Sequence, residues 1–148
     1  MIYADTSAVV RAYIVDEPGH PGLANLIVQA QQPVLTSEIT RIEFAGAVVR
    51  AERAGRIRMA NELIRLFDRQ SRSGTGLALV PLHRVPILDS AQHLASKHGL
   101  GALDSIHLAV ALDESERIEN EAERSAFVFV TRDRAQAAAA QAEGLTVV

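Results

Sequence analysis

The chain has 148 residues, 48% of them hydrophobic and 22% charged, which fits one ordinary globular domain over residues 1–148. The formal net charge of −3 gives no global sign of a nucleic-acid partner, and the absence of cysteine excludes disulfides and zinc–thiolate sites and suits a reducing cytoplasm. The chain shows no signal-peptide pattern and no apolar run that could cross a bilayer, so we expect no membrane contact.

The first elements alternate between strand and helix. The apolar run "MIYA" (residues 1–4) predicts a buried strand that stops at a carboxylate. Residues 6–15 and 21–30 have helical patterns, and the turn-forming sequence "DEPGH" (16–20) separates them. "PVLT" (33–36) predicts the second strand.

The middle of the chain is mostly helical. Residues 37–55 predict a long helix in which Ile39, Ile42 and Val49 recur at helical spacing and Gly55 marks the end. Residues 59–72 predict another helix. The sequence "SGTG" (73–76) is typical of a loop, and "LALVPL" (77–82) predicts a third strand.

The last third repeats the alternation. Residues 86–99 begin with proline and end at glycine, as helices often do. We expect a helix at 103–116 opened by Asp104, a strand at 126–131, a helix at 133–144 and a last strand at 145–148. Alternating strands and helices favour a mostly parallel sheet covered on both faces, so the predicted fold class is a three-layer α/β/α domain.

Four acids occupy similar places in this pattern. Asp5 follows the first strand, Asp133 follows the strand at 126–131, Asp104 opens a helix, and Glu43 lies inside the helix after the second strand. Ligands of open parallel sheets bind beyond the carboxyl ends of the strands. We therefore expect these acids to converge on one rim.

A structural explanation exists for each aspartate. Aspartate is a preferred helix N-cap, and acids in a first helical turn suit the helix dipole. Glu43 does not fit that explanation, because it is predicted to lie within its helix beside Ile39 and Ala47. A carboxylate beside an apolar stripe is costly unless it reaches solvent or a cation compensates for its lost hydration.

Clustered carboxylates repel one another and cannot all ionise without a positive partner. The oxygen ligands on offer favour Mg²⁺ or Mn²⁺ over zinc. His107, three residues after Asp104, could add a nitrogen ligand, although we expect it to pack or to support the acids instead.

Other chemistries are absent from the sequence. We find no phosphate-binding glycine loop, no dinucleotide fingerprint and no nucleophile elbow. A phospho-accepting receiver domain would need adjacent acids after its first strand and a lysine after a late strand. Here Asp5 is followed by Thr6, and Lys97 is the only lysine.

Charge is uneven along the chain. Between residues 41 and 72 there are eight arginines against four acids, a local excess of four positive charges, whereas residues 113–123 are strongly acidic. Both segments fit solvated helix faces. The arginine-rich segment could also guide a polyanion, and we single out Arg50, Arg53 and Arg56 as candidate RNA contacts.

These motifs, taken together, resemble the PIN-domain ribonucleases, and among them the VapC-type toxins of toxin–antitoxin pairs. The opening "MIYADTSAVV" resembles the family's first strand, and "LTSEITRIEFAGAVVRA" the segment with the second acid. "LDSIHLAVAL" resembles the helix with the third acid, and "FVTRDRAQAAAAQAEGLTVV" the closing segment with the fourth. The loop before the third acid departs from the family, because it reads "GLGAL" where many relatives have a basic residue.

The resemblance implies a metal-dependent endoribonuclease that uses Mg²⁺ or Mn²⁺. Its implied metal-binding catalytic acids are Asp5, Glu43, Asp104 and Asp133, with Asp133 the one most expected to act through water. Thr6, Ser7 and Thr131 would be polar helpers. The family also implies a homodimer and an antitoxin whose C-terminal segment covers the site. The alternative is a non-catalytic α/β protein-binding module in which the acids are only helix caps.

Overall fold

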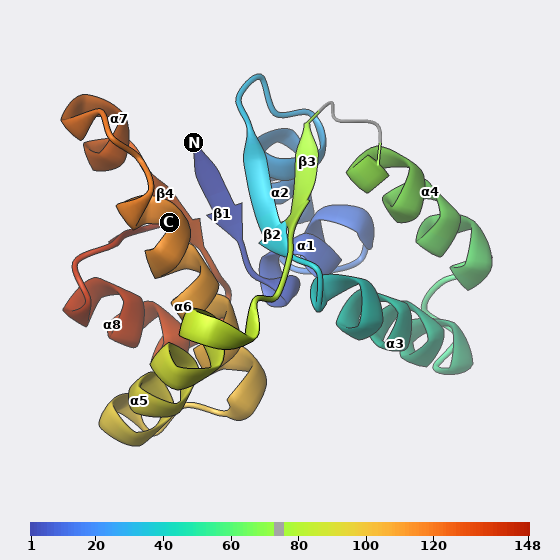
Figure 1. The fold of residues 1–148 in the computed structure, drawn as a ribbon. Helices are drawn as coiled ribbons and strands as arrows, with labels where there is room; N and C mark the ends of the chain where they lie inside the picture. The colour runs from blue at the N-terminus through green and yellow to red at the C-terminus, as the bar shows by residue number, and fades with distance from the viewer. Residues whose placement is uncertain (73–75) are drawn as a thin grey trace.

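The computed structural model describes residues 1–72 and 76–148, so most of the loop expected at 73–76 lies outside the described residues. Five strands form one parallel sheet in the order β3-β2-β1-β4-β5, with β1 at its centre (Figure 1). The strands are β1 (Ile2–Ala4), β2 (Val34–Ser37), β3 (Leu77–Val80), β4 (Val128–Val130) and β5 (Thr146–Val147).

Helices cover both faces of this sheet (Figure 1). The group that packs on one face is α1 (Thr6–Tyr13), α2 (His20–Leu23), the π-helical turn η1 (Ala24–Val28), α3 (Thr40–Arg53) and α4 (Ala60–Arg72). The group on the other face is η2 (Arg84–Leu88), α5 (Asp89–His98), α6 (Ala102–Glu116) and α8 (Arg134–Ala142). The predicted three-layer α/β/α fold is confirmed.

Two hydrophobic cores follow from the alternation of side chains along the strands. Ile2 and Ala4 of β1 point into the core under α1, α3 and α4, while Tyr3 between them points into the core under α5, α6 and α8. All three side chains are buried. Strands buried on both faces have near-continuous apolar sequences, which explains why "MIYA" lacks polar residues.

Several predicted element boundaries were wrong. The helix expected over 37–55 begins only at Thr40, because β2 continues through Ser37 and a turn follows it. The helix expected over 21–30 is two short helical turns, α2 and η1. The short helix α7 (Glu121–Ser125) was not expected, since its exposed residues carry no apolar period.

Two corrections affect individual residues of α3. Glu43 lies in the first turn of α3 and not in its interior, so its position alone does not set it apart from the other acids. Ile42, which we expected on the apolar stripe, is 76% exposed, whereas Phe44 and Val48 are fully buried. The later start of the helix explains the position of Glu43, and the exposure of Ile42 follows from a buried face formed by Phe44, Val48 and Ala51.

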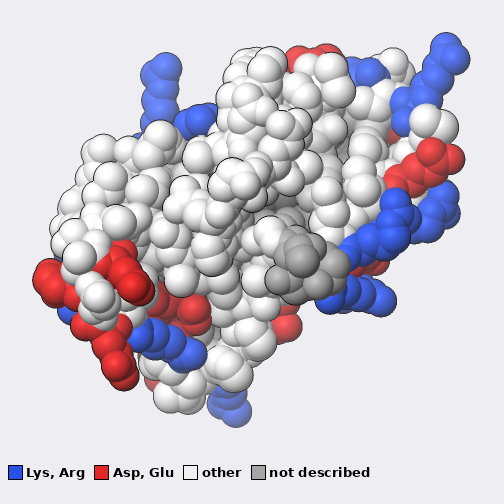
Figure 2. Space-filling model, turned by 90° about the horizontal axis from the view of Figure 1, so that it is seen from above, with Lys and Arg blue, Asp and Glu red and all other residues white. Residues whose placement is uncertain are grey.

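Figure 2 views the molecule from the amino-terminal ends of the strands. Acidic side chains gather at the end that carries α7 and basic side chains at the end that carries α4, with mostly uncharged surface between them. The acidic and the arginine-rich segments of the sequence therefore lie at opposite ends of this face. Among the described residues, no helix is long and apolar enough to cross a membrane.

Candidate active site

The topology creates a crevice at the carboxyl end of β1. The chain passes from β1 to β2 and β3 on one side of the sheet and then crosses to β4 on the other side. Helices α1 and α3 therefore lie on one face at this point, and α6 lies on the other. Crevices at such reversals of strand order are the usual ligand sites of open parallel sheets.

A pocket of about 300 Å³ occupies this crevice, and we call it the acidic pocket. Its lining includes Asp5 from the end of β1, Glu43 from α3 and Asp104 from α6, together with Thr6 and Ser7. Three of the four acids singled out from the sequence thus share one pocket, although they are separated by 38 and 61 residues along the chain. Asp133 is not among its lining residues.

Asp5 is the most buried of these acids, with 3% of its surface exposed. It caps α1 by accepting the backbone N–H of Ala8 (2.9 Å), so the expected capping role is present. Ser7 donates to both carboxylate oxygens, and the hydroxyl of Thr131 donates to Oδ2 (2.9 Å). Burial nevertheless raises the pKa of Asp5, because these donors do not fully replace water around the charge.

Glu43 is held by two hydrogen bonds to its Oε2 atom. Thr6 donates its hydroxyl proton at 2.6 Å, and Nε2 of the buried His107 lies 2.9 Å away. Partial burial acts to raise the pKa of Glu43, but the bonds from His107 and Thr6 outweigh it, so the pKa is lowered. Glu43 is therefore the acid whose ionised form the protein supports most directly.

Asp104 lies in the first turn of α6 but does not cap it, since the N-cap is Gly101. A Cβ on Gly101 would lie 3.3 Å from Oδ2 of Asp104, so the glycine leaves room for this carboxylate. Burial raises the pKa of Asp104, and the charges of Asp133 and Glu43 add to the effect. The repulsion expected between clustered acids is present at this residue.

Asp133 is exposed and caps α8 by accepting the backbone N–H of Gln136 (2.8 Å). The backbone N–H of Asp133 donates to Thr131, whose hydroxyl also contacts Asp5, and the Gln136 amide donates to the carbonyl of Asp104 (3.1 Å). A hydrogen-bonded chain thus connects the fourth acid to two of the acids that line the pocket.

Two features decide whether the acidic pocket fits a divalent cation: the arrangement of its acids and the chemistry of its donor atoms. Within residues 1–72 and 76–148, no group of three or more His, Cys, Asp or Glu side chains is arranged to hold a metal ion as the side chains stand. The donor set nevertheless has the right chemistry, because its carboxylate and hydroxyl oxygens are the ligands of hard cations. Burial is the main cause of the raised pKa values of Asp5 and Asp104, and a cation bound between these carboxylates would favour their ionised forms.

The three candidate arginines have different surroundings. Arg50 lines the acidic pocket, and an adjoining hollow is lined by both Arg50 and Arg56. Arg56 is held in an ion-pair cluster with Asp16 (2.8 Å) and Glu17 (2.6 Å). Arg53 is exposed near the end of α3 and is not among the residues that line either hollow.

Sequence reasoning missed two lining residues of the acidic pocket, Arg11 and Glu17, and the bonding of His107. The i, i+6 spacing of Arg11 and Glu17 crosses the end of α1 and gives no periodic signal. His107 was noticed because of its spacing from Asp104. Its partner Glu43 is 64 residues away, so only the fold reveals the contact.

Comparisons with known proteins place this geometry in context. The family model described as "PIN domain" matches residues 2–142. The crystal structure of PAE2754 from Pyrobaculum aerophilum is similar with a TM-score of 0.61 and 21% identity, covering 99% of this chain and 90% of that chain. The crystal structure of FitAcB from Neisseria gonorrhoeae is similar with a TM-score of 0.57 and 20% identity, covering 99% and 96%. A search of curated proteins gives no match.

Proposed function

The chain belongs to the PIN-domain family, and from this premise we propose that it is a metal-dependent endoribonuclease that acts as the toxin of a toxin–antitoxin pair. PIN domains are generally nucleases, so hydrolysis of nucleic acid is the family's ordinary activity. The choice of RNA and the role as a toxin are our proposals for this chain.

One observation carries the proposal: Asp5, Glu43 and Asp104 come from three distant segments and line the same pocket. Burial destabilises the ionised forms of Asp5 and Asp104, and at Asp104 the charges of Asp133 and Glu43 add to the effect. A fold gains no stability from gathering like charges, so the arrangement is best explained by a cation that these carboxylates bind.

We propose that Asp5, Glu43 and Asp104 hold Mg²⁺ or Mn²⁺, and that Asp133 contributes directly or through water. When bound, such an ion activates water and stabilises the charge that develops as a phosphodiester is hydrolysed. Three groups, Ser7, Ala8 and Thr131, each supply one proton to the Asp5 carboxylate, whereas a carboxylate offers about four lone-pair sites. Acceptor capacity therefore remains for a ligand.

The protein's own polar groups orient these acids. Thr6 and His107 keep Glu43 ionised and fix its Oε2 atom at the pocket. Ser7 and Thr131 hold the Asp5 carboxylate from opposite segments of the chain. These contacts support the helper role that the family resemblance implies for Thr6, Ser7 and Thr131, and we propose it for this chain.

We propose that RNA approaches along the basic side of the acidic pocket. Arg50 supports this path, because its side chain lines the pocket that contains the three acids. The exposed Arg53 would add a contact with a more distant phosphate. Arg56 would contribute less to RNA binding, because Asp16 and Glu17 already neutralise its charge. Phosphate contacts of this kind supply affinity without reading bases.

We further propose an antitoxin partner, a homodimer and a cytoplasmic location. An apolar hollow of about 640 Å³ between the end of α1 and α4, lined in part by Ile14, Leu63 and Leu66, could accept a partner helix. The exposed Ile42 borders a second hollow of about 620 Å³, which supports contact with a second copy. The cytoplasmic location follows from a substrate of cellular RNA.

The alternative, a non-catalytic module, has one observation in its favour: Asp5 and Asp133 do cap helices. Glu43 and Asp104 make no capping bond among the hydrogen bonds of the described residues, although both lie in first turns. Capping therefore accounts for Asp5 and Asp133, while the structural explanation for Glu43 and Asp104 is limited to the helix dipole at a first turn.

Cleavage of single-stranded RNA by the purified protein tests the proposal. We expect cuts with Mg²⁺ or Mn²⁺ and none with EDTA, and we expect Glu43→Gln to slow cleavage by about 100-fold or more, as the loss of a preorganised electrostatic group does. Glu62→Gln on α4 is the matched control and should cut like the wild type. No cleavage by the wild type with either metal would support the non-catalytic module, and equal cleavage by Glu43→Gln and Glu62→Gln would refute the role of Glu43.

A further inference from the structure

A buried pair of side chains, Tyr3 and His107, lies directly behind Glu43. Tyr3 is 0% exposed and His107 is 2% exposed. The Tyr3 hydroxyl lies 3.0 Å from Nδ1 of His107, and Nε2 of the same ring lies 2.9 Å from Oε2 of Glu43. A continuous line of contacts therefore runs from the centre of the sheet to the acidic pocket.

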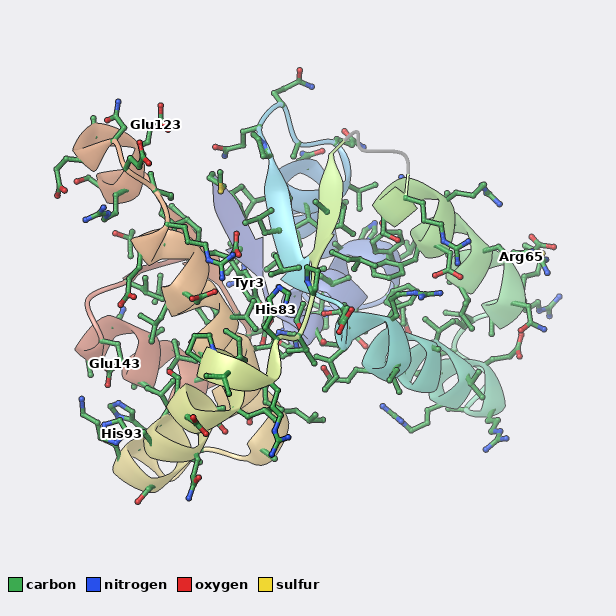
Figure 3. All side chains as sticks on the ribbon, viewed as in Figure 1. Tyr3, Arg65, His83, His93, Glu123 and Glu143 are labelled. Atoms are coloured by element: carbon green, nitrogen blue, oxygen red, sulfur yellow. The ribbon has the colours of Figure 1, made fainter. Side chains whose placement is uncertain are left out.

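The ring of His107 has little room to take another orientation. The rings of His107 and Tyr3 meet in a T-shaped arrangement, with their centroids 6.1 Å apart and an interplanar angle of 68°. Tyr3 is itself stacked on Phe129 of β4, at 5.7 Å and 7°. Figure 3, in which Tyr3 is labelled, shows this residue on the central strand beside α6, so the sheet itself fixes the start of the line.

The groups at each end decide which atom donates in the Tyr3–His107 and His107–Glu43 hydrogen bonds. An ionised carboxylate only accepts hydrogen bonds, and Oε2 of Glu43 lies 2.6 Å from the Thr6 hydroxyl and 2.9 Å from Nε2 of His107, the geometry of an acceptor between two donors. A lone pair on Nε2 at 2.9 Å from that oxygen would be repelled, so Nε2 carries the proton. The single hydroxyl proton of Thr6 is used in its 2.6 Å bond to Glu43, so Thr6 does not donate to Nε2.

The other ring nitrogen then acts as an acceptor. Among the hydrogen bonds of the described residues, Nδ1 of His107 is the only acceptor for the Tyr3 hydroxyl, 3.0 Å away, so the hydroxyl donates to Nδ1. Every group in the line has a partner of the right kind.

We propose that Tyr3 and His107 are positioning residues for the acidic pocket: Tyr3 donates to Nδ1 of His107, and the Nε2–H tautomer so fixed donates to Glu43 and holds its carboxylate toward the ligand site. Neither residue contacts the substrate in this role. The effect on metal binding and cleavage rests on the proposed function, whereas the tautomer belongs to the protein whatever its activity.

The chain supplies a matched control for this proposal. It has only two tyrosines, and the second, Tyr13, is also buried and donates its hydroxyl to Gln70, away from the acidic pocket. Tyr3→Phe and Tyr13→Phe each remove one buried hydroxyl and keep the ring. Only Tyr3→Phe breaks the line to Glu43.

The first test is ¹⁵N NMR of the histidine rings in the protein without added metal. We expect His107 to show a protonated Nε2 and an unprotonated, hydrogen-bonded Nδ1. Tyr3→Phe should move the Nδ1 resonance to that of a nitrogen without a hydrogen bond, and Tyr13→Phe should not move it. A wild-type ring protonated on Nδ1, or on both nitrogens, would overturn the assigned tautomer.

The second test is the affinity for Mn²⁺, measured by calorimetry, together with RNA cleavage. Partners that orient metal-binding groups typically matter by about 10- to 100-fold, so we expect Tyr3→Phe to lose affinity in this range. His107→Gln, whose amide can still donate to Glu43, should retain more affinity than His107→Leu. Equal affinities of Tyr3→Phe and Tyr13→Phe, or of the Gln and Leu variants, would refute the positioning role.

The two proposals fail in different ways. A wild-type protein that neither binds Mn²⁺ nor cuts RNA would refute the proposed function, while the NMR experiment would still decide the tautomer. A wild type that does both, with Tyr3→Phe unchanged in every measurement, would refute only the role of Tyr3 and His107.

Discussion

The ionised forms of Asp5 and Glu43 have opposite effects on the stability of the fold, although both acids line the same pocket. Burial raises the pKa of Asp5, so its charge opposes folding, whereas hydrogen bonds lower the pKa of Glu43, so its charge favours folding. The difference arises from burial: the desolvation of the deeply buried Asp5 outweighs its hydrogen bonds, whereas the bonds from His107 and Thr6 outweigh the partial burial of Glu43. This contrast gives two predictions with opposite signs.

Asp5→Asn should stabilise the protein without added metal and abolish RNA cleavage. Asparagine caps helices as well as aspartate does, so the bond from Ala8 is retained while the buried charge is removed. Because the folded pKa of Asp5 is raised, the wild type loses stability as the pH rises from the ordinary aspartate pKa through the folded pKa. The melting temperature of Asp5→Asn should therefore exceed that of the wild type at pH 7.

This advantage should disappear at a pH below the ordinary aspartate pKa, where Asp5 is protonated in both the folded and the unfolded chain. Melting curves of both proteins in EDTA across this pH range provide the measurement. A lower melting temperature for Asp5→Asn at pH 7 would show that the charge of Asp5 is already compensated within the protein.

Glu43→Gln should lower stability at neutral pH. The charged hydrogen bonds from Thr6 and His107 become neutral ones, a change worth about 1 kcal/mol, or about 2–4 °C in melting temperature for a domain of this size. The stability that Glu43 supplies is present above the ordinary glutamate pKa and is lost as the pH falls through its lowered folded pKa. The deficit of the variant should shrink correspondingly in acid.

The same melting curves in EDTA decide this prediction. A variant as stable as the wild type at pH 7 would mean that the bonds to Thr6 and His107 do not favour the charged form.

At the scale of elements, α3 carries Glu43 and two of the three arginines proposed to meet RNA, Arg50 and Arg53, while Arg56 lies just beyond its end. Arg50 faces the acidic pocket, whereas Arg56 is paired with Asp16 and Glu17. Arg50→Ala should weaken RNA binding and reduce the salt dependence of log K by about 0.7 for each lost phosphate contact with a single strand. Arg56→Ala should change the slope less, because that guanidinium is already neutralised.

Binding titrations of a noncleavable RNA at several salt concentrations measure these slopes. Arg53→Ala gives an intermediate case, since its side chain is exposed but is not among the pocket's lining residues. An Arg50→Ala slope equal to that of the wild type would assign Arg50 to the solvated surface or to a subunit contact.

The element pattern was predictable because strands buried on both faces and helices with one apolar face have different periods. All five strands were expected close to their observed positions, and Gly55 follows the end of α3 with the positive φ expected of a helix terminator. The start of α3 was missed because "SEIT" fits a helix start as well as the end of a strand. Ser37 belongs to the strand because β2 pairs with β3 as far as this residue.

The site was predictable only in part. Asp5, Glu43 and Asp104 could be selected from their places relative to strand ends and helix starts, and they do line one pocket. The contacts that fix their chemistry could not be selected, because Thr131 reaches Asp5 across 126 residues and His107 reaches Glu43 across 64. Such pairings depend on strand order, which no local pattern specifies.

At the scale of the molecule, the acidic pocket offers a simple means of control by a partner protein. An arginine side chain pairs bidentately with carboxylates and does not lose its proton, so it would compete with a divalent cation for Asp5, Glu43 and Asp104. We predict that a neighbouring gene encodes a small protein with a basic C-terminal segment, and that a peptide from this segment inhibits cleavage.

Excess Mg²⁺ should partly relieve this inhibition if the arginine displaces the ion. The same peptide with its arginines replaced by glutamine is the control and should inhibit little. Inhibition that is independent of Mg²⁺ would show that the peptide blocks the RNA path and does not compete for the carboxylates.

The central claim is that Asp5, Glu43 and Asp104 bind one divalent cation in the acidic pocket. Anomalous diffraction from crystals soaked in Mn²⁺ tests it most directly. We predict a single strong anomalous peak in the pocket, with oxygens of the three carboxylates about 2.0–2.6 Å from it, directly or with one replaced by water, and no peak there in crystals of Asp5→Asn. A wild-type pocket without a peak, or a peak that persists in Asp5→Asn crystals at the same strength, would contradict the account.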